Sequence, residues 1–204
     1  MKKYLSLASL ALLTPFVYAD DTNTQAAPEA FKPHPYVEAT IGSATAIDGC
    51  DDIDNDICDD KDTGLRLAFG YQLNRQGFVE FGFINFGETS YDLREILSAD
   101  VTAKAEVTAL YGMGGLILPT QYAEFYGKAG FALTQVDISA SGPGGTYSVD
   151  GTGFSAMGSA GVHVPLTKNL GLVGQMDYVL DAGDEDKTGT SDMFLISAGA
   201  RLSF

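Results

Sequence analysis

Charged and amide side chains recur singly inside segments of apolar and small residues, and these side chains could do chemistry. They are Arg66, Glu80, Lys128, Gln175, Asp177 and Arg201. A charge enclosed among apolar residues costs several kcal/mol unless a counter-charge lies close to it. We therefore expect two interior ion pairs, Glu80 with Lys128 and Asp177 with Arg201. Such pairs either form a packed polar plug or line a narrow pore that conducts ions.

The chain has two cysteines, Cys50 and Cys58, on either side of an acidic segment. Thiols of exported proteins oxidise outside the cytosol, so we expect a disulfide inside one surface loop. Closing a loop this short would add roughly 2–3 kcal/mol by restricting the unfolded chain. The alternative is a metal site that uses both thiols, although no histidine lies near them in the sequence.

Aspartates fill the segment between the cysteines. Asp52, Asp54 and Asp56 alternate as in a calcium-binding loop, and carboxylate oxygens are the ligands that calcium takes. The glycine and the closing glutamate of the EF-hand pattern are missing. Two interpretations stay open, a solvated acidic loop and a weak divalent-cation site shared with lipopolysaccharide phosphates. We expect no cofactor.

Hydrolytic chemistry has little support in the sequence. His163 is the one histidine expected inside the fold. Ser155 and Ser159 lie on the same face of its predicted strand, near residues 154–164. An acyl-transfer enzyme needs a nucleophile with a base in reach. The chain has no Gly-x-Ser-x-Gly elbow. Both serines are expected on the polar face of the strand, whereas an acyl chain would arrive at the opposite, apolar face. We therefore expect no enzymatic activity.

The bulk composition excludes some classes of protein. The 204 residues carry a net charge of −15 and include 24 Gly, 10 Tyr and 12 Phe with no Trp. Nucleic-acid binding needs clustered Lys and Arg, which this chain lacks. A membrane helix needs about 20 consecutive apolar residues, and no such run follows residue 20. If the chain spans a membrane, it must cross as strands.

The first 19 residues are typical of an export signal. Lys2 and Lys3 precede an apolar stretch at 5–17, and Ala19 supplies a small residue at the expected cleavage point. An uncleaved anchor is the alternative. Residues 20–35 contain three prolines and show no periodicity, so we expect a flexible periplasmic tail there. The remaining residues, 36–204, form the predicted folded domain.

Alternation with a period of two dominates this domain. In residues 64–73 apolar side chains occupy every second position, which places them on one face of a strand. Seven more segments behave alike, near residues 37–41, 79–83, 107–113, 125–133, 154–164, 170–180 and 194–204. We assign their apolar residues to a lipid-facing surface, including the aromatic residues Phe81, Tyr111, Phe125, Tyr178 and Phe204.

A soluble exported sheet protein, such as a lipocalin-like binder, also alternates. Two features favour a membrane barrel instead. The polar face consists mainly of Gly and Ser with few charges, as a narrow lumen requires. Predicted connections are short near 74–77, 119–122 and 165–169 and long near 46–63, 87–101, 138–150 and 181–191. We predict an all-β, eight-stranded antiparallel transmembrane β-barrel with both termini in the periplasm.

Four segments resemble the OmpA-like outer-membrane β-barrel family, at residues 70–74, 79–87, 125–130 and 161–166. The resemblance covers residues 36–204, the transmembrane part alone, so we expect no peptidoglycan-binding domain. It implies a lumen network that plugs or gates the barrel, with Glu80 at the acidic position and Lys128 at a basic one. The chain departs from the family where glycines near Gly114 replace a lumen lysine and Gln175 replaces an arginine. Phe204 resembles the terminal aromatic residue that the outer-membrane assembly machinery reads.

These expectations combine into a monomeric protein of the bacterial outer membrane, in contact with membrane lipid and lipopolysaccharide. Its expected role is structural or surface-interacting, with acidic loops that present a binding surface to an extracellular ligand. A narrow pore for ions or small solutes is the alternative, and a lipid-modifying enzyme is less favoured.

Overall fold

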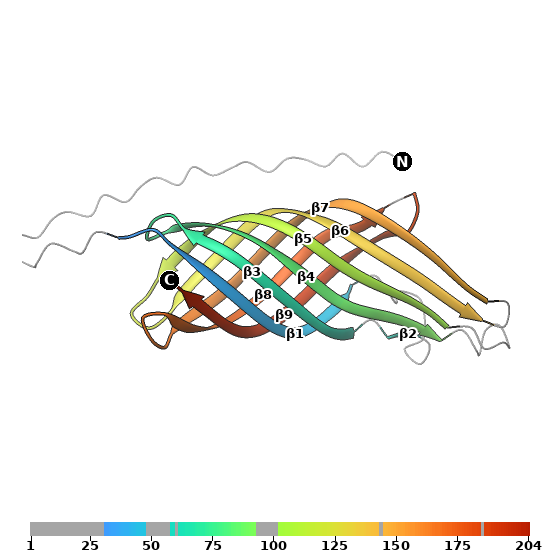
Figure 1. Ribbon diagram of the computed structural model, residues 1–204, viewed down its shortest axis with the longest axis horizontal. Coiled ribbons are helices and arrows are strands. Elements are labelled where there is room, and N and C mark those ends of the chain that lie inside the picture. Colours follow the sequence, from blue (N-terminus) through green and yellow to red (C-terminus); the bar gives the residue numbers. More distant parts are fainter. Residues whose placement is uncertain (1–30, 48–57, 60, 93–101, 143–144, 185) are drawn as a thin grey trace, which may run out of the picture. The chain divides into compact units, whose positions relative to one another are not determined.

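The computed structural model describes residues 31–47, 58–59, 61–92, 102–142, 145–184 and 186–204 (Figure 1). These residues form nine strands of one antiparallel sheet, and they contain no helix long and apolar enough to cross a membrane. The strands are β1 His34–Ala46, β2 Cys58–Asp59, β3 Lys61–Gln72, β4 Gly77–Asp92, β5 Thr102–Pro119, β6 Glu124–Gly142, β7 Gly145–Pro165, β8 Leu170–Asp184 and β9 Gly189–Ser203.

The eight long strands close into a ring. Their hydrogen-bonded order is β4-β3-β1-β9-β8-β7-β6-β5, and β4 also pairs with β5. The two-residue β2 pairs only with the end of β4. The first and last strands meet with Tyr36 opposite Ser203. A closed ring satisfies backbone groups between strands, as a bilayer requires. The predicted eight-stranded antiparallel barrel is confirmed.

The two ends of the barrel differ. Three tight connections, at residues 73–76, 120–123 and 166–169, lie at one end, which we call the turn end. The C-terminus lies there too, because the backbone N–H of Phe204 donates to the carbonyl of Pro35 at 3.1 Å. The opposite end, which we call the loop end, carries β2 and the far ends of the longest strands (Figure 1).

Two of the predicted long loops are wrong. β6 and β7 stay paired from Glu124 and His163 out to Gly142 and Gly145, so residues 138–142 and 145–150 continue the two strands. β8 and β9 likewise remain paired to Asp184 and Gly189. Ladder hydrogen bonds need only the backbone, so polar sequences continue a strand beyond the apolar band. Residues 48–57, 60 and 93–101, in the other two predicted loops, lie outside the described residues.

Side chains alternate between the outer wall and the lumen as the period-two pattern predicts. On β3 the outward Leu67 and Phe69 are 49% and 54% exposed, whereas the intervening Ala68 is 8% exposed. β5 is an exception to the predicted assignment, because its apolar face at residues 107–113 points into the lumen, with Tyr111 only 4% exposed. Its outward neighbour is Leu110. Both faces of β5 are apolar at this level, so the pattern does not distinguish them.

The lumen contains three layers. Near the turn end lies a small cluster with Tyr36, Phe78 and Tyr126. Near the loop end lies a larger apolar cluster that includes Ile84, Phe86 and Leu195. Buried charged residues occupy the level between them, since Glu38 follows Tyr36 along β1 and precedes the apolar Ala44. The charged layer therefore lies between two apolar layers.

Lumen aromatic rings lie directly over glycines of the neighbouring strand. Tyr36 pairs with Gly70 across β1 and β3, and a Cβ at Gly70 would overlap the Tyr36 ring. Three more pairs repeat the arrangement, Tyr111 with Gly82, Phe78 with Gly115 and Tyr126 with Gly161. The absence of a side chain on each glycine makes room for a large ring inside a narrow barrel.

Candidate functional site

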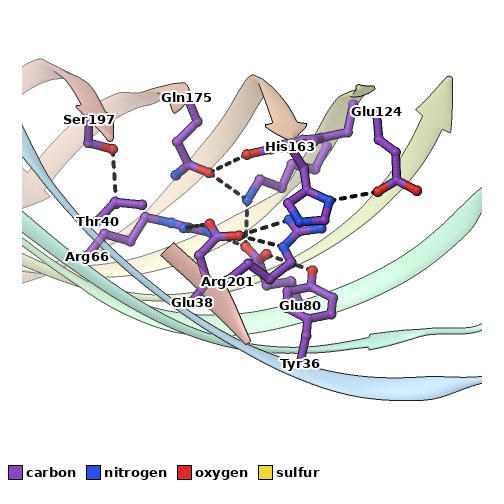
Figure 2. A network of polar contacts seen from close by, with 12 residues as sticks. Tyr36, Glu38, Thr40, Arg66, Glu80, Glu124, His163, Gln175, Ser197 and Arg201 are labelled. Carbon is purple, nitrogen blue, oxygen red and sulfur yellow. Dashed lines mark hydrogen bonds and ion pairs between the residues drawn. The ribbon is translucent and has the colours of Figure 1, made fainter. Parts of the chain in front are cut away.

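Glu80 of β4 is the centre of the polar layer in the lumen (Figure 2). Its carboxylate accepts hydrogen bonds from Lys128 Nζ at 2.7 Å, Tyr36 Oη at 2.9 Å and Tyr111 Oη at 3.1 Å. It also forms an ion pair with the Arg66 guanidinium. Glu80 and Arg66 are both fully buried, so these contacts replace water completely. The structure thus brings Glu80 and Lys128 together.

Glu38 of β1 is the second carboxylate of the network. Arg66 pairs with one of its oxygens, and Arg201 Nε donates to the other at 2.9 Å (Figure 2). Arg66 therefore bridges Glu38 and Glu80, and Arg201 extends the network to β9. An arginine fork suits this role because its planar donors reach two carboxylates at once.

Asp177 and Gln175 of β8 complete the network. Gln175 donates to Asp177 at 2.6 Å and accepts from Tyr126 Oη at 2.9 Å. Asp177 lies 3.9 Å from Arg66 Nε. Gln175 also lies 3.3 Å from Lys128 Nζ, so this glutamine links Asp177 to the network.

The predicted pair of Asp177 with Arg201 is wrong. Asp177 lies opposite Leu195 and Arg201 lies opposite Gly171, although β8 and β9 are neighbours. Asp177 lies six residues, about 20 Å, further along β8 than the residue that Arg201 faces. Arg201 instead lies directly opposite Glu38 in the pairing of β1 with β9.

Positive and negative charges are equal in number in this layer. The buried anions are Glu38, Glu80 and Asp177, and the buried cations are Arg66, Lys128 and Arg201, each at most 5% exposed. Aromatic faces support the cations as well, with the Arg201 guanidinium 4.2 Å from the Tyr36 ring centroid and the Lys128 ammonium 5.2 Å from that of Tyr126. A desolvated cation gains from such a contact. The layer is electrically neutral, although the buried Arg66 Nε and Asp177 Oδ1 have no hydrogen-bond partner among the described residues.

Sequence reasoning missed four members of the network, Tyr36, Glu38, Tyr111 and Tyr126. Glu38 has the parity of the polar face of its strand, but its partners depend on the register between strands. Tyr36 and Tyr126 share the parity of Glu38 and Lys128 on their strands. A search for tyrosines at lumen parity would have found these two.

The other predicted sites are placed only in part. Phe204 lies at the turn end and is 65% exposed, consistent with its outward assignment. Cys50, Asp52, Asp54 and Asp56 lie outside the described residues, as does the side chain of Cys58, so the disulfide and the divalent-cation site remain predictions. Elsewhere, the described residues contain no group of three His, Cys, Asp or Glu placed to hold a metal ion.

His163 belongs to the mouth of the lumen at the turn end. Its Nδ1 lies 2.8 Å from a carboxylate oxygen of Glu124, on the neighbouring strand (Figure 2). Ser155 instead bonds with Thr134 and with the carbonyl of Asp181, on the loop-end side of the network. Eight residues of strand, about 26 Å, separate Ser155 from His163. These two residues form no nucleophile–base pair.

Outside the lumen, four acidic residues form a row across adjacent strands near the loop end. Glu88 lies opposite Glu106, Glu106 opposite Asp137, and Asp137 opposite Asp150. Lys104 partly offsets the row, with its Nζ at 2.8 Å from Glu88. Like charges directly opposite each other on a sheet are destabilising. The four acidic residues therefore repel one another in the folded barrel.

Asp137→Asn is expected to stabilise the folded barrel by about 0.2–1 kcal/mol, because it removes the repulsion on both sides of Asp137. The gain should shrink when salt screens the row. Urea unfolding in detergent at low and at high salt measures the gain. A lower stability of Asp137→Asn at low salt would contradict the repulsion.

The fold and the lumen together define a class: a membrane-spanning barrel with a packed polar interior. The chain matches the family described as "Outer membrane protein beta-barrel domain" over residues 9–201. It belongs to this family of bacterial outer-membrane barrels, as the resemblance to OmpA-like barrels predicted. No curated protein sequence matches the chain significantly.

Solved structures share the fold at low identity. OprG of Pseudomonas aeruginosa matches with a TM-score of 0.53 and 12% identity, covering 86% of this chain and 97% of that one. Ail of Yersinia pestis, in complex with the heparin analogue sucrose octasulfate, matches with a TM-score of 0.51 and 15% identity over 82% and 99%. A major outer membrane protein of Thermus thermophilus matches with a TM-score of 0.52 and 15% identity over 85% and 100%. At such identities the likeness concerns the fold alone.

Proposed function

We propose that this protein is a closed outer-membrane barrel with a structural and surface-interaction role. The observation that carries the proposal is the neutral charged layer, in which three buried anions meet three buried cations. Glu80 alone holds two cations and two tyrosine hydroxyls. A pore would need a wet, continuous path at this level, whereas these charged side chains form ion pairs with one another across the lumen.

A narrow pore for ions is the alternative. An eight-stranded barrel has an interior just wide enough for side chains to fill. Apolar layers on both sides of the network, with Phe78 and Tyr126 at the turn end and Phe86 and Leu195 toward the loop end, oppose hydrated ions further. These layers favour the plug over the pore.

The loop end is proposed to face the outside of the cell. Outer-membrane barrels place their short turns in the periplasm, and the three tight connections here share one end with Phe204. We propose that an export signal at residues 1–19 delivers the chain, and that the assembly machinery reads Phe204. The closed ring has no long strand edge left for pairing, which supports a monomer.

Acidic residues at the loop end indicate the chemistry of a surface partner. The outer row of Glu88, Glu106, Asp137 and Asp150 gives this end negative charge. Ail is known in complex with a polyanion, but the charge of this chain would repel one. We propose a cationic extracellular ligand, and contact with lipopolysaccharide phosphates through shared divalent cations.

Surface labelling of intact cells tests the proposed orientation. An epitope is inserted between Gly142 and Gly145, at the loop end, or in the turn at 120–123, at the turn end. We expect antibody to bind intact cells only in the first case, and to bind both after the outer membrane is permeabilised. Labelling of intact cells through the 120–123 insertion alone would contradict the orientation and the surface role.

A further inference from the structure

An apolar cavity of about 260 Å³ lies inside the barrel at the loop end, away from the charged network. Its apolar walls include Ala105, Val107, Val136, Ile138, Ala182 and Met193, from four different strands. Most of these residues also belong to the larger apolar cluster of the lumen or pack against it. The cavity therefore continues the apolar interior towards the outside.

Small side chains account for this space. An eight-stranded lumen is filled when long side chains point inward, as Arg66, Tyr36 and Glu80 do in the charged layer. At the cavity, alanines occupy inward positions on three strands: Ala46 of β1, Ala103 and Ala105 of β5, and Ala182 of β8. Alanine cannot reach the barrel axis, so the lumen is left unfilled at this level.

The threonines Thr89 and Thr190 also line the cavity. The Ser191 hydroxyl is shielded from a water-sized molecule, so it does not face the open space. The apolar residues therefore determine what the cavity can hold.

We propose that this cavity binds a small apolar molecule. An apolar cavity of about 150 Å³ is enough to bind benzene, so the larger volume here suits a ligand of about ten non-hydrogen atoms. This molecule lies against Val107, Val136 and Met193.

A molecule bound there does not pass through the barrel. The apolar cluster with Ile84 and Leu195 lies between the cavity and the charged layer. The site is therefore a receptor pocket at the loop end, and it does not depend on which side of the membrane that end faces.

Methionine methyl groups provide the test. Met193 lines the cavity, Met113 and Met157 lie in the lumen without lining it, and Met176 is 47% exposed on the outer wall. Protein with 13C-labelled methionine methyls, in lipid nanodiscs, is titrated with benzyl alcohol, and with glycerol as the polar comparison. We expect a saturable shift of the Met193 signal with benzyl alcohol alone. Met176 should show only the non-saturating drift of a solute that partitions into lipid.

Cavity-filling variants complete the test. Ala105→Leu places a side chain in the cavity and should abolish the saturable Met193 shift; Ala46→Val, at another lining position, serves if the first does not fold. Ala129→Leu is the matched control, since this outward residue lies between Gly114 and Gly158, where space is open. A Met193 signal that never saturates, or that saturates equally in Ala105→Leu, would overturn the proposal.

Discussion

Glu80→Gln is expected to lower the free energy of unfolding by about 3–5 kcal/mol, the cost of breaking a buried ion pair by removing one partner. The amide keeps the size of the side chain but removes one of three lumen anions. Arg66 and Lys128 then lose the carboxylate that both pair with, and both are buried at 5% exposure or less. Urea unfolding in detergent, followed by the shift in gel migration between folded and boiled protein, measures the loss.

Two further variants distinguish the loss of charge balance in the lumen from the general effect of replacing a glutamate by glutamine. Glu106→Gln makes the same replacement in the exposed outer row, where it removes repulsion from Glu88 and Asp137 and should stabilise the barrel by about 0.2–1 kcal/mol. Adding Lys128→Gln to Glu80→Gln restores equal numbers of lumen charges and should recover part of the loss, since contacting residues are coupled. Equal effects of Glu80→Gln and Glu106→Gln would contradict the central position of Glu80.

Gly70→Ala is expected to lower the free energy of unfolding by about 1–3 kcal/mol, the typical cost of overpacking. A methyl group at this position would overlap the Tyr36 ring. Tyr36 cannot move away freely, because its hydroxyl bonds Glu80 and its face contacts Arg201. The same unfolding assay measures this loss.

Gly158→Ala is the matched control for Gly70→Ala. No heavy atom lies within 4 Å of a Cβ built at Gly158, another strand glycine. Without a clash, replacing glycine by alanine restricts the unfolded chain and stabilises a protein by about 0.4–1 kcal/mol. The two variants should therefore move stability in opposite directions. Stabilisation by Gly70→Ala would show that the ring does not need the space.

Much of the fold follows from the sequence because side chains alternate strictly along a strand. Arg66 between Leu65 and Leu67, and Lys128 between Gly127 and Ala129, are placed in the lumen by parity alone. The parity rule fails for Tyr111, since β5 has apolar residues on both faces where the lumen itself is apolar.

Pairing across the lumen could not be predicted in the same way. Which charges meet depends on the stagger of all eight strands, and one strand's sequence does not contain that information. Arg201 pairs with Glu38 across the junction of the first and last strands, 163 residues apart. The lengths of β6 and β7 were missed for a related reason, because backbone pairing continues where the apolar signal ends.

Planar-bilayer recording tests the closed lumen most directly. Purified protein is folded, reconstituted and shown to be inserted by its heat-dependent gel migration. If the charged layer of Glu38, Glu80, Asp177, Arg66, Lys128 and Arg201 seals the barrel, the current stays at the baseline of the empty bilayer under applied voltage. Reproducible unitary openings, present with folded protein and lost after boiling, would contradict the account and identify the barrel as a pore.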